Sequence, residues 1–419
     1  MKITFICAVF PPEPAPCGVM AHQLATQLVR DAHDVTMIVP IPNRPEGITY
    51  PGFQRRLFSR TMTHEGYTLV RCANWLIGKK RRSIDRILEN LTFGFSSAWA
   101  AWREGRPDVI VVESWPLFAT QIAAGLARWW RVPYLYYVQD VYPETVEVAG
   151  FLNSRGLLAR TCRAWDRHLC LQSSRVIVIS ETMRRLLVSN RRLSKDRFTV
   201  IHNFIDESLF PVCQKDTTWR RSHGIADTAF VAMFAGTLGH ISGAEVLVEV
   251  ANLLQGEKNI LLLCIGEGVL KQDMIDKSSL LQLDNIRFLP FQPSEIVPLV
   301  QASSDVALLT MRANHSDASV PSKLISYLAS FRPVVCAANP ESAVAQTVQD
   351  AAAGIVVCPG DARAIADAIL WLSREPETAS QMGQNARRYF EAHYTLKQAY
   401  GQFSDLIRQG ADSRTSPLS

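Results

Sequence analysis

Short apolar runs alternate along the chain with longer segments in which apolar residues recur every three or four positions. This alternation is typical of βαβ units, in which helices cover both faces of a parallel sheet. The apolar runs predict strands in the first half at Lys2–Val9, Asp34–Val39, Asp108–Val112, Tyr134–Val138 and Arg175–Ile179, and in the second half at Phe230–Phe234, Ile260–Ile265, Val306–Leu309, Pro333–Cys336 and Ile355–Val357.

Segments with helical periodicity lie between these strands. They predict helices at Gly18–Arg30, Ser83–Trp102, Leu117–Trp130, Gly156–Leu171 and Glu181–Ser189 and, after Pro376, at Glu377–Ala392 and Leu396–Arg408. The whole pattern predicts an α/β fold of two Rossmann-like halves, each a doubly wound parallel sheet, that face each other across a cleft. Ligands of such sheets gather beyond the carboxyl ends of the strands, so we expect the binding site in that cleft.

Changes in composition divide the chain further. Residues 206–227 are polar and mixed in charge, which predicts a linker between an N-terminal domain, 1–205, and a C-terminal domain, 228–392. Residues 393–410 are expected to form a last helix that returns toward the N-terminal domain. The polar residues 411–419 are expected to be a frayed tail.

Length and composition exclude several classes of protein. With 419 residues, 47% of them hydrophobic and 20% charged, the chain is too long for one small module and too apolar to be disordered. Its nine cysteines are scattered without a C-x-x-C pair, which fits neither a disulfide framework nor a zinc site and indicates a reducing cytoplasm. No apolar stretch reaches the length of a spanning helix, and Ile3–Phe10 is too short for a signal peptide.

The net charge of +5 is too small to indicate nucleic-acid binding, yet it is unevenly distributed. Residues 1–205 hold 27 Lys and Arg against 16 Asp and Glu, net +11, and seven of the nine tryptophans. Two of these, Trp129 and Trp130, stand between arginines. This pattern favours docking of the first half on an anionic membrane surface, and a solvated basic face with buried tryptophans is the alternative.

The first predicted strand is followed by FPPEPAPCG rather than by G-x-G-x-x-G, which disfavours a dinucleotide-dependent dehydrogenase. Gly18 begins a predicted helix there. Free N–H groups at a helix start attract phosphate, although an ordinary βα turn would look the same. After the fourth predicted strand come Gln139, Asp140 and Glu144, whose polar groups could bind a sugar hydroxyl or act as a base. The alternative is that Asp140 caps a turn before Pro143.

The second half contains three candidate anion sites at strand ends, and the chain has no D-x-D pair to clamp a metal on a diphosphate. Two are turns in which absent side chains let the backbone approach a phosphate: Gly236, Gly239 and Gly243, and then Gly266 and Gly268 around Glu267. The third places Pro321, Ser322 and Lys323 at a helix start, where a hydroxyl, an ammonium and the helix dipole converge. Glycine turns and helix caps also occur without ligands, which is the alternative for each site.

These segments occur in a recognisable order: FPPE with Gly18, IPNRPEG (41–47), QDVYPE (139–144), RVIVISE (175–181), VIHNFID (200–206), FAGTLG (234–239), IGEG (265–268), NIRFLPFQP (285–293) and VPSKLISYLASFRPVV (320–335). The series resembles the family-4 glycosyltransferases of the GT-B fold, and especially the bacterial branch that builds colanic acid, capsule and O-antigen. The resemblance covers nearly the whole chain.

Enzymes of this family bind a nucleotide sugar in the C-terminal domain and an acceptor in the N-terminal domain. They retain the anomeric configuration without an obligatory metal, so the resemblance implies no cofactor and no metal beyond the donor substrate. It implies a donor site with three parts. The diphosphate cradle is made of Gly236, Thr237, Gly239, Ser322 and Lys323. The loop that faces the nucleotide is made of Gly266, Glu267 and Gly268, and the closing loop contains Gly18. Asp140 and Lys323 are the expected catalytic residues. Acceptor contacts are expected from Glu13, Gln139 and Glu144.

The sequence departs from the family at several polar positions. An Arg and a Lys of the family are replaced by Thr237 and Ser242, and a histidine is replaced by Gln139. Two family glutamates fall at Ala318 and Ser326. Lys323 is then the main positive charge left for a diphosphate.

The leading hypothesis is transfer of a hexose or deoxyhexose, such as fucose from a GDP donor, to a polyprenyl-diphosphate-linked saccharide in exopolysaccharide synthesis. We expect a cytoplasmic protein, peripheral on the inner face of the cytoplasmic membrane, that binds no nucleic acid. Two alternatives remain. One is a partner subunit that binds nucleotide sugar without turning it over, and the other is a sugar-nucleotide epimerase, which needs acid and base residues flanking the sugar.

Overall fold

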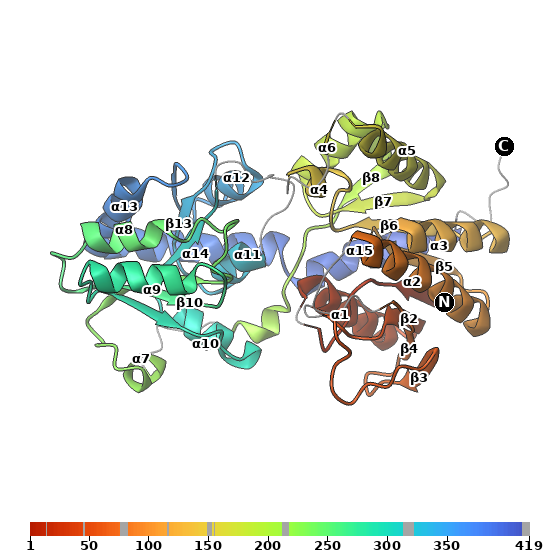
Figure 1. Ribbon diagram of the computed structural model, residues 1–419, viewed down its shortest axis with the longest axis horizontal. Helices are drawn as coiled ribbons and strands as arrows, with labels where there is room; N and C mark the ends of the chain where they lie inside the picture. The colour runs from red at the N-terminus through yellow and green to blue at the C-terminus, as the bar shows by residue number, and fades with distance from the viewer. Residues whose placement is uncertain are drawn as a thin grey trace. The chain divides into compact units, whose positions relative to one another are not determined.

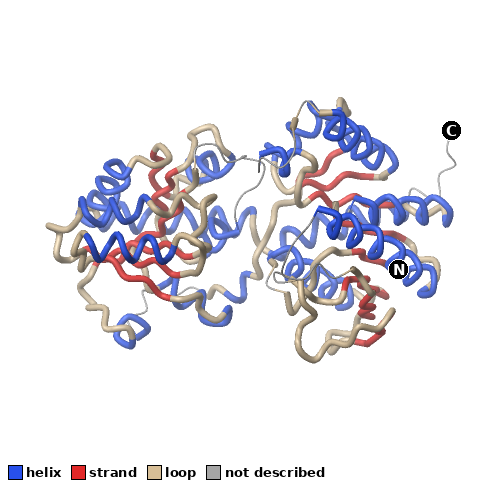
Figure 2. The backbone as a smooth tube through the Cα atoms, viewed as in Figure 1, coloured by secondary structure: helices blue, strands red, loops and turns tan. Residues whose placement is uncertain are grey.

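The computed structural model divides the chain into two compact units, Met1–Asn203 with Leu396–Ser419, and Phe204–Thr395 (Figure 1). The structure describes residues 1–13, 15–44, 47–75, 83–114, 117–148, 153–154, 156–211, 218–312 and 322–412. Within each unit the strands lie at the centre and the helices surround them (Figure 2). This confirms the predicted α/β class with two Rossmann-like sheets.

The sheet of the first unit has eight strands in the order β3-β4-β2-β1-β5-β6-β7-β8. All neighbours are parallel except β3 and β4, which form an antiparallel edge. The strands are β1 (Lys2–Ile6), β2 (Asp34–Pro40), β3 (Phe58–Met62), β4 (Thr68–Cys72), β5 (Val109–Glu113), β6 (Tyr134–Val138), β7 (Arg175–Val178) and β8 (Phe198–Val200). Because the chain goes from β1 to β2 on one side and later to β5 on the other, β1 and β5 meet at a topological switch point.

The helices of the first unit pack in two groups, with α2 on α3, α3 on α5 and α5 on α6 in one, and α1 on α15 in the other. They are α1 (Pro16–Arg30), α2 (Ser83–Glu104), α3 (Leu117–Trp130), α4 (Glu144–Val148), α5 (Leu157–Gln172), α6 (Glu181–Arg191) and α15 (Leu396–Asp412), with the 3-10 turn η1 (Lys195–Arg197). The last helix thus belongs to the first unit, where the ring of Phe403 meets that of Tyr137 edge-on at 5.2 Å.

The second unit has six parallel strands in the order β11-β10-β9-β12-β13-β14. They are β9 (Phe230–Ala235), β10 (Ile260–Ile265), β11 (Ile286–Leu289), β12 (Val306–Thr310), β13 (Val334–Ala337) and β14 (Gly354–Val357). Residues alternate between two cores: Ala232 and Phe234 of β9 enter one, and Val231 and Met233 enter the other. A sheet buried on both faces explains why its strands read as unbroken apolar runs.

The helices of the second unit cover both faces of this sheet, with α8 on α13 and α11 on α14. They are α7 (Thr218–Ser222), α8 (Val246–Leu253), α9 (Lys271–Leu280), α10 (Val297–Ala302), α11 (Ser322–Ala329), α12 (Ala343–Asp350), α13 (Ala362–Arg374) and α14 (Pro376–His393), with the 3-10 turns η2 (Glu207–Leu209) and η3 (Ser294–Ile296).

The interpretation of 206–227 as a linker needs correction. Residues 218–227 are part of the second unit, because Trp219 and Arg220 of α7 are buried there. Arg220 pairs with Asp305 at 2.6 Å and donates to the carbonyls of Ser303 and Ala229. Although residues 206–227 are polar in sequence, the buried charge of Arg220 fastens α7 to the sheet of the second unit.

A buried ion cluster connects β6 with α4, α5 and α6. Arg191 at the end of α6 is fully buried and pairs with Asp166 at 2.7 Å and with Glu144 at 2.6 Å. Asp166 also accepts a hydrogen bond of 2.8 Å from the hydroxyl of Tyr136 on β6. A buried charge of this kind is tolerated only while its partners remain.

We expect Arg191→Met to destabilise the first unit by about 3–5 kcal/mol, because the substitution leaves buried Asp166 without a compensating charge and Glu144 with only its longer contact to Arg163. Urea unfolding followed by circular dichroism measures the loss. The exposed Arg185 on the same helix is the matched control, and Arg185→Met should change the unfolding free energy by less than about 0.5 kcal/mol. A similarly small effect for both variants would contradict the role given to Arg191.

Candidate functional site

Two glycine-containing loops of the second unit lie against each other beyond the carboxyl ends of β9 and β10. The N–H of Gly236 donates to the carbonyl of Ile265 at 2.9 Å, and that of Leu238 donates to the carbonyl of Glu267, also at 2.9 Å. A Cβ on Gly266 would lie 1.9 Å from the carbonyl oxygen of Gly236, and one on Gly268 would lie 2.2 Å from that of Leu238. Only residues without side chains allow this approach, so both glycines are required by the loop packing itself.

Lys323 reaches these loops from the first turn of α11. Its ammonium lies 4.4 Å from the ring centroid of Phe234 and 3.1 Å from the position that a Cβ of Gly236 would take. Desolvation by burial lowers the pKa of Lys323 to about 8. Within the described ranges, no carboxylate lies at ion-pair distance from this amine. The structure therefore brings Lys323 and Gly236 together, as the sequence predicts, and leaves the charge available for an anion.

The other predicted donor residues surround this point less closely. Ser322 and Thr237 are exposed at the surface, and the methyl group of Thr237 lies beside Gly239. Glu267 is exposed and pairs with Lys271 at 2.6 Å. Of the two positions where the family resemblance expects glutamate, Ala318 lies outside the described residues, as does Pro321. The hydroxyl of Ser326 donates to the carbonyl of Lys323 and accepts from Gln301.

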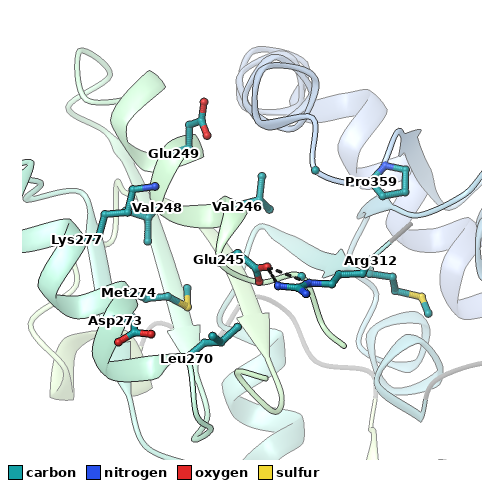
Figure 3. A pocket seen from close by; sticks show the side chains of 13 residues that line it. Glu245, Val246, Val248, Glu249, Leu270, Asp273, Met274, Lys277, Arg312 and Pro359 are labelled. Atoms are coloured by element: carbon teal, nitrogen blue, oxygen red, sulfur yellow. Dashed lines mark hydrogen bonds and ion pairs between the residues drawn. The ribbon is translucent and has the colours of Figure 1, made fainter. Parts of the chain in front are cut away.

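A cavity of about 380 Å³ lies near these loops, on the side of α8 and α9. The sequence does not predict it. Figure 3 shows Glu245 and Arg312 pointing toward each other at this cavity, and their ion pair measures 2.5 Å. Gly243 lines it too, and a Cβ on that glycine would lie 3.2 Å from the backbone of Met311. Gly243 therefore serves loop packing on this side.

In the first unit, the loop after β1 is braced by a buried carboxylate. Glu13 is 3% exposed, and its carboxylate accepts hydrogen bonds of 2.8 Å from the N–H groups of Asn43 and Arg44. The prediction that Glu13 contacts an acceptor is therefore corrected, because its carboxylate is buried and hydrogen-bonded to backbone N–H groups of the protein. Gly18 is buried at the start of α1, where a Cβ would lie 3.0 Å from the backbone of Phe10.

The prediction that Glu144 contacts an acceptor is likewise corrected. Its carboxylate binds Arg191 through both oxygens, at 2.6 and 2.8 Å, and also accepts from Asn190 and Arg163. Burial acts to raise the pKa of Glu144, but the hydrogen bonds and charge of Arg191 outweigh it and lower the pKa. Glu144 belongs to the buried ion cluster of the fold.

Gln139 and Asp140, after β6, lie close to a residue that the sequence reasoning missed, Glu113 at the end of β5. Asp140 is exposed, and desolvation of its carboxyl raises its pKa. Glu113 is 6% exposed, and burial raises the pKa of its carboxyl to about 7. A charged residue that ends an otherwise apolar strand, as in VIVVE, is the signal that could have identified it.

The described residues form neither a metal site nor a membrane span. No three His, Cys, Asp or Glu side chains within the described ranges are grouped so as to hold a metal ion. Across the same ranges, every helix is too short or too polar to cross a lipid bilayer.

Comparison with known families matches almost the whole chain. Residues 17–209 match the model described as Glycosyltransferase Family 4, and residues 215–389 match the model described as Glycosyl transferases group 1. The chain belongs to the GT-B glycosyltransferases. The glycine loops and Lys323 thus lie in the half matched by the group 1 model, and Glu113 and Asp140 in the half matched by the family 4 model.

Individual relatives of this glycosyltransferase are distant. WcaI of Escherichia coli (strain K12), named for a glycosyl transferase role in colanic acid biosynthesis, is 22% identical over 406 residues, or 95% of this chain and 98% of WcaI. WbjE of Pseudomonas aeruginosa, named as a glycosyltransferase, is 23% identical over 70% of this chain and 74% of its own. The crystal structure of Anabaena Alr3699/HepE in complex with UDP has a TM-score of 0.71 at 16% identity, covering 98% of this chain and 100% of that chain. These structural likenesses show the shared fold.

We expect Gly266→Ala to destabilise the second unit by about 1–3 kcal/mol, because the new methyl group meets the Gly236 carbonyl and the backbone there has a φ of +153°. Gly256→Ala is the control, since its Cβ would have no neighbour within 4 Å. Thermal unfolding measures both. Equal stability of the two variants would show that the loops do not need their close approach.

Proposed function

We propose that this glycosyltransferase moves a sugar from a nucleotide diphosphate sugar to a lipid-linked saccharide, with retention of configuration and without a metal. The second unit would hold the donor diphosphate, and the first unit would hold the acceptor. Relatedness to WcaI, which is named for colanic acid biosynthesis, supports an exopolysaccharide product. The bound UDP named in the structure of the Anabaena protein supports a nucleotide sugar as donor.

The observation that carries this proposal is the ammonium of Lys323 beside Gly236, which pairs with no carboxylate in the part of the chain that the structure describes. As the bond between sugar and phosphate breaks, negative charge accumulates on the leaving diphosphate. A fixed cation stabilises that charge more than it stabilises the intact donor, so it lowers the barrier. The free N–H groups at the start of α11 carry partial positive charge, which also favours an anion there.

The charge of Lys323 should make UDP binding depend on pH. In the free protein the amine is protonated below its pKa of about 8, and a bound diphosphate raises that pKa. UDP affinity should therefore be constant below pH 8 and fall above it, by up to about tenfold per pH unit. Calorimetry between pH 7 and 10 with UDP, and separately with GDP, measures this.

Lys323→Met should weaken nucleotide binding at pH 7 by about 10- to 100-fold and abolish the pH dependence, since a charge-assisted contact is lost. Lys258→Met, which removes an exposed lysine just before the amino end of β10, is the matched control. Nucleotide affinity that is unchanged in Lys323→Met would refute the donor site. Binding without transfer or donor hydrolysis in the wild type would instead favour the non-catalytic partner subunit.

An anionic membrane surface is the proposed location of the lipid-linked acceptor, on the cytoplasmic side. Three tryptophans are more than half exposed on the neighbouring helices α2 and α3, namely Trp99, Trp102 and Trp129, at 53%, 51% and 67% (Figure 1). Arg103, Arg106, Arg128 and Arg131 are exposed near the ends of the same helices, and α3 contains no acidic residue. Exposed indole rings and arginines together suit the interface of an anionic bilayer.

Flotation with vesicles tests this surface. We expect the protein to float with phosphatidylglycerol-containing vesicles at low salt and not with pure phosphatidylcholine. The double variant Trp102→Ser, Trp129→Ser should lower the vesicle-bound fraction about fivefold, because two indole rings can no longer insert into the bilayer interface beside the arginines. Trp371→Ser, at a tryptophan 43% exposed in the second unit, should have no effect. Equal recovery with both kinds of vesicle would exclude electrostatic docking.

A further inference from the structure

A polar cavity of about 650 Å³ lies at the amino edge of the sheet in the second unit. Three segments line it, each of which leads into a strand: residues 224–229 before β9, 255–261 into β10 and 284–287 into β11. Because these strands are parallel, their amino ends share one edge and the glycine loops lie at the other. A parallel strand rises about 3.3 Å per residue, so the six residues of β10 place the cavity roughly 17 Å from the glycine loops.

The charged side chains that line this cavity leave it with a positive charge. Lys258 and Arg287 are both exposed there, and Asp284 is the one acid among the described residues of the lining. Within the described part of the chain, none of these three side chains forms an ion pair. One carboxylate against two cations favours an anionic ligand.

Neighbouring acids do not neutralise the two cations. Glu257, next to Lys258 in the chain, pairs with Arg374 at 3.2 Å. Asp227, which follows the first lining segment, pairs with Arg221 at 2.6 Å. Both carboxylates are therefore already occupied by other arginines.

The guanidinium of Arg287 is held from one side. Its Nη1 donates to the carbonyls of His223 and Gly224, at 3.2 Å each. Its Nε and Nη2 groups make no hydrogen bond to any residue that the structure describes. The side chain is thus fixed beside the segment that leads to β9, with donors left for a ligand.

A buried acceptor lines the same cavity. Asn285 is only 7% exposed, and its Nδ2 donates to the carbonyl of Ala251 at 2.8 Å, which sets the orientation of the amide. Its Oδ1 is buried without a hydrogen-bond partner among the described residues. A buried acceptor without a donor is unfavourable, so this oxygen calls for an O–H or N–H group. The carboxylate of Asp284, the preceding residue, is a second acceptor.

We propose that this cavity binds a small phosphorylated polyol, such as a sugar phosphate, at a site separate from the donor site. Lys258 and Arg287 bind the phosphate through charge-assisted hydrogen bonds. Hydroxyl groups of the same molecule donate to Asn285 Oδ1 and to the carboxylate of Asp284. The volume of about 650 Å³ falls within the range of roughly 300–1,000 Å³ that is usual for small-molecule sites.

The two kinds of group distinguish this ligand from simpler ones. Inorganic phosphate satisfies the cations but brings no polyol hydroxyls to the two acceptors. An uncharged sugar brings the hydroxyls but leaves the cations without a counter-charge. Affinity should therefore require both parts in one molecule.

The test is calorimetry of the full-length protein with glucose 6-phosphate, mannose 6-phosphate and glycerol 3-phosphate, each measured beside inorganic phosphate and glucose. Saturating UDP is present throughout, so that the donor site is filled. At least one of the three phosphorylated compounds should bind at least about fivefold more tightly than inorganic phosphate, and glucose should show no binding.

The double variant Lys258→Met, Arg287→Met should weaken this binding at least about tenfold, because two charge-assisted contacts are lost. The double variant Arg363→Met, Arg388→Met removes two exposed cations from α13 and α14 of the same unit and is the matched control. Both variants should melt within a few degrees of the wild type by circular dichroism. Lys323→Met should bind the phosphorylated compound as the wild type does.

Several results would overturn the inference. They are no binding of any phosphorylated compound, affinity no better than that of inorganic phosphate, and equal affinities in the site variant and its control. Loss of the binding in Lys323→Met would assign these compounds to the donor site and would overturn the separate site as well.

Discussion

The ammonium of Lys323 lies against Gly236 with no carboxylate of the described residues at ion-pair distance, and the proposed donor site of the second unit depends on that one charge. Burial makes an isolated cation unfavourable, as its lowered pKa reflects. Backbone contacts hold the surrounding loops in place: Gly236 and Gly266 lie in close backbone contact, and the hydroxyl of Tyr327 on α11 donates to, and accepts from, the backbone of Ala235. A bound anion would neutralise the buried ammonium without having to displace a carboxylate of the described residues.

The carboxylates of the first unit separate into two kinds. Glu13 and Glu144 are fully hydrogen-bonded, one to the backbone N–H groups of a loop and the other to buried Arg191, so they hold the fold together. Glu113 is also deeply buried, but within the described residues its hydrogen bond comes from a single backbone N–H, that of Ala8, and burial raises the pKa of its carboxyl to about 7.

Much of the fold can be predicted from the sequence, because the strands of a parallel sheet that is buried on both faces consist of continuous apolar residues. The bounds of β6, β10 and α3 are those predicted. The strands β3, β8 and β11 lie at sheet edges and were missed because polar or exposed residues, such as Arg60 and Thr61 of β3, break the apolar run there. The strand β4 was missed although it is mostly buried, because its five residues include Thr68 and Arg71. The pairing of Lys323 with the glycine loop was predictable because both follow strand ends on the same edge.

Long-range partners were not predictable in this way. No local pattern tells that Glu144 meets Arg191, 47 positions along the chain, or that Glu13 accepts from Arg44. The end of an apolar strand marks Glu113 in the sequence, but its neighbours, which come from β6, from α1 and from the residues just after β1, are known only in three dimensions.

The most direct test of the central claim is the titration of Lys323 itself, followed by NMR of the protein carrying ¹³C-methylated lysines, with Lys323→Arg to assign the signal. We expect a pKa near 8 for Lys323 in the free protein, and a rise of about one unit or more when UDP is bound. A pKa close to the ordinary 10.5 that does not move with UDP would contradict it.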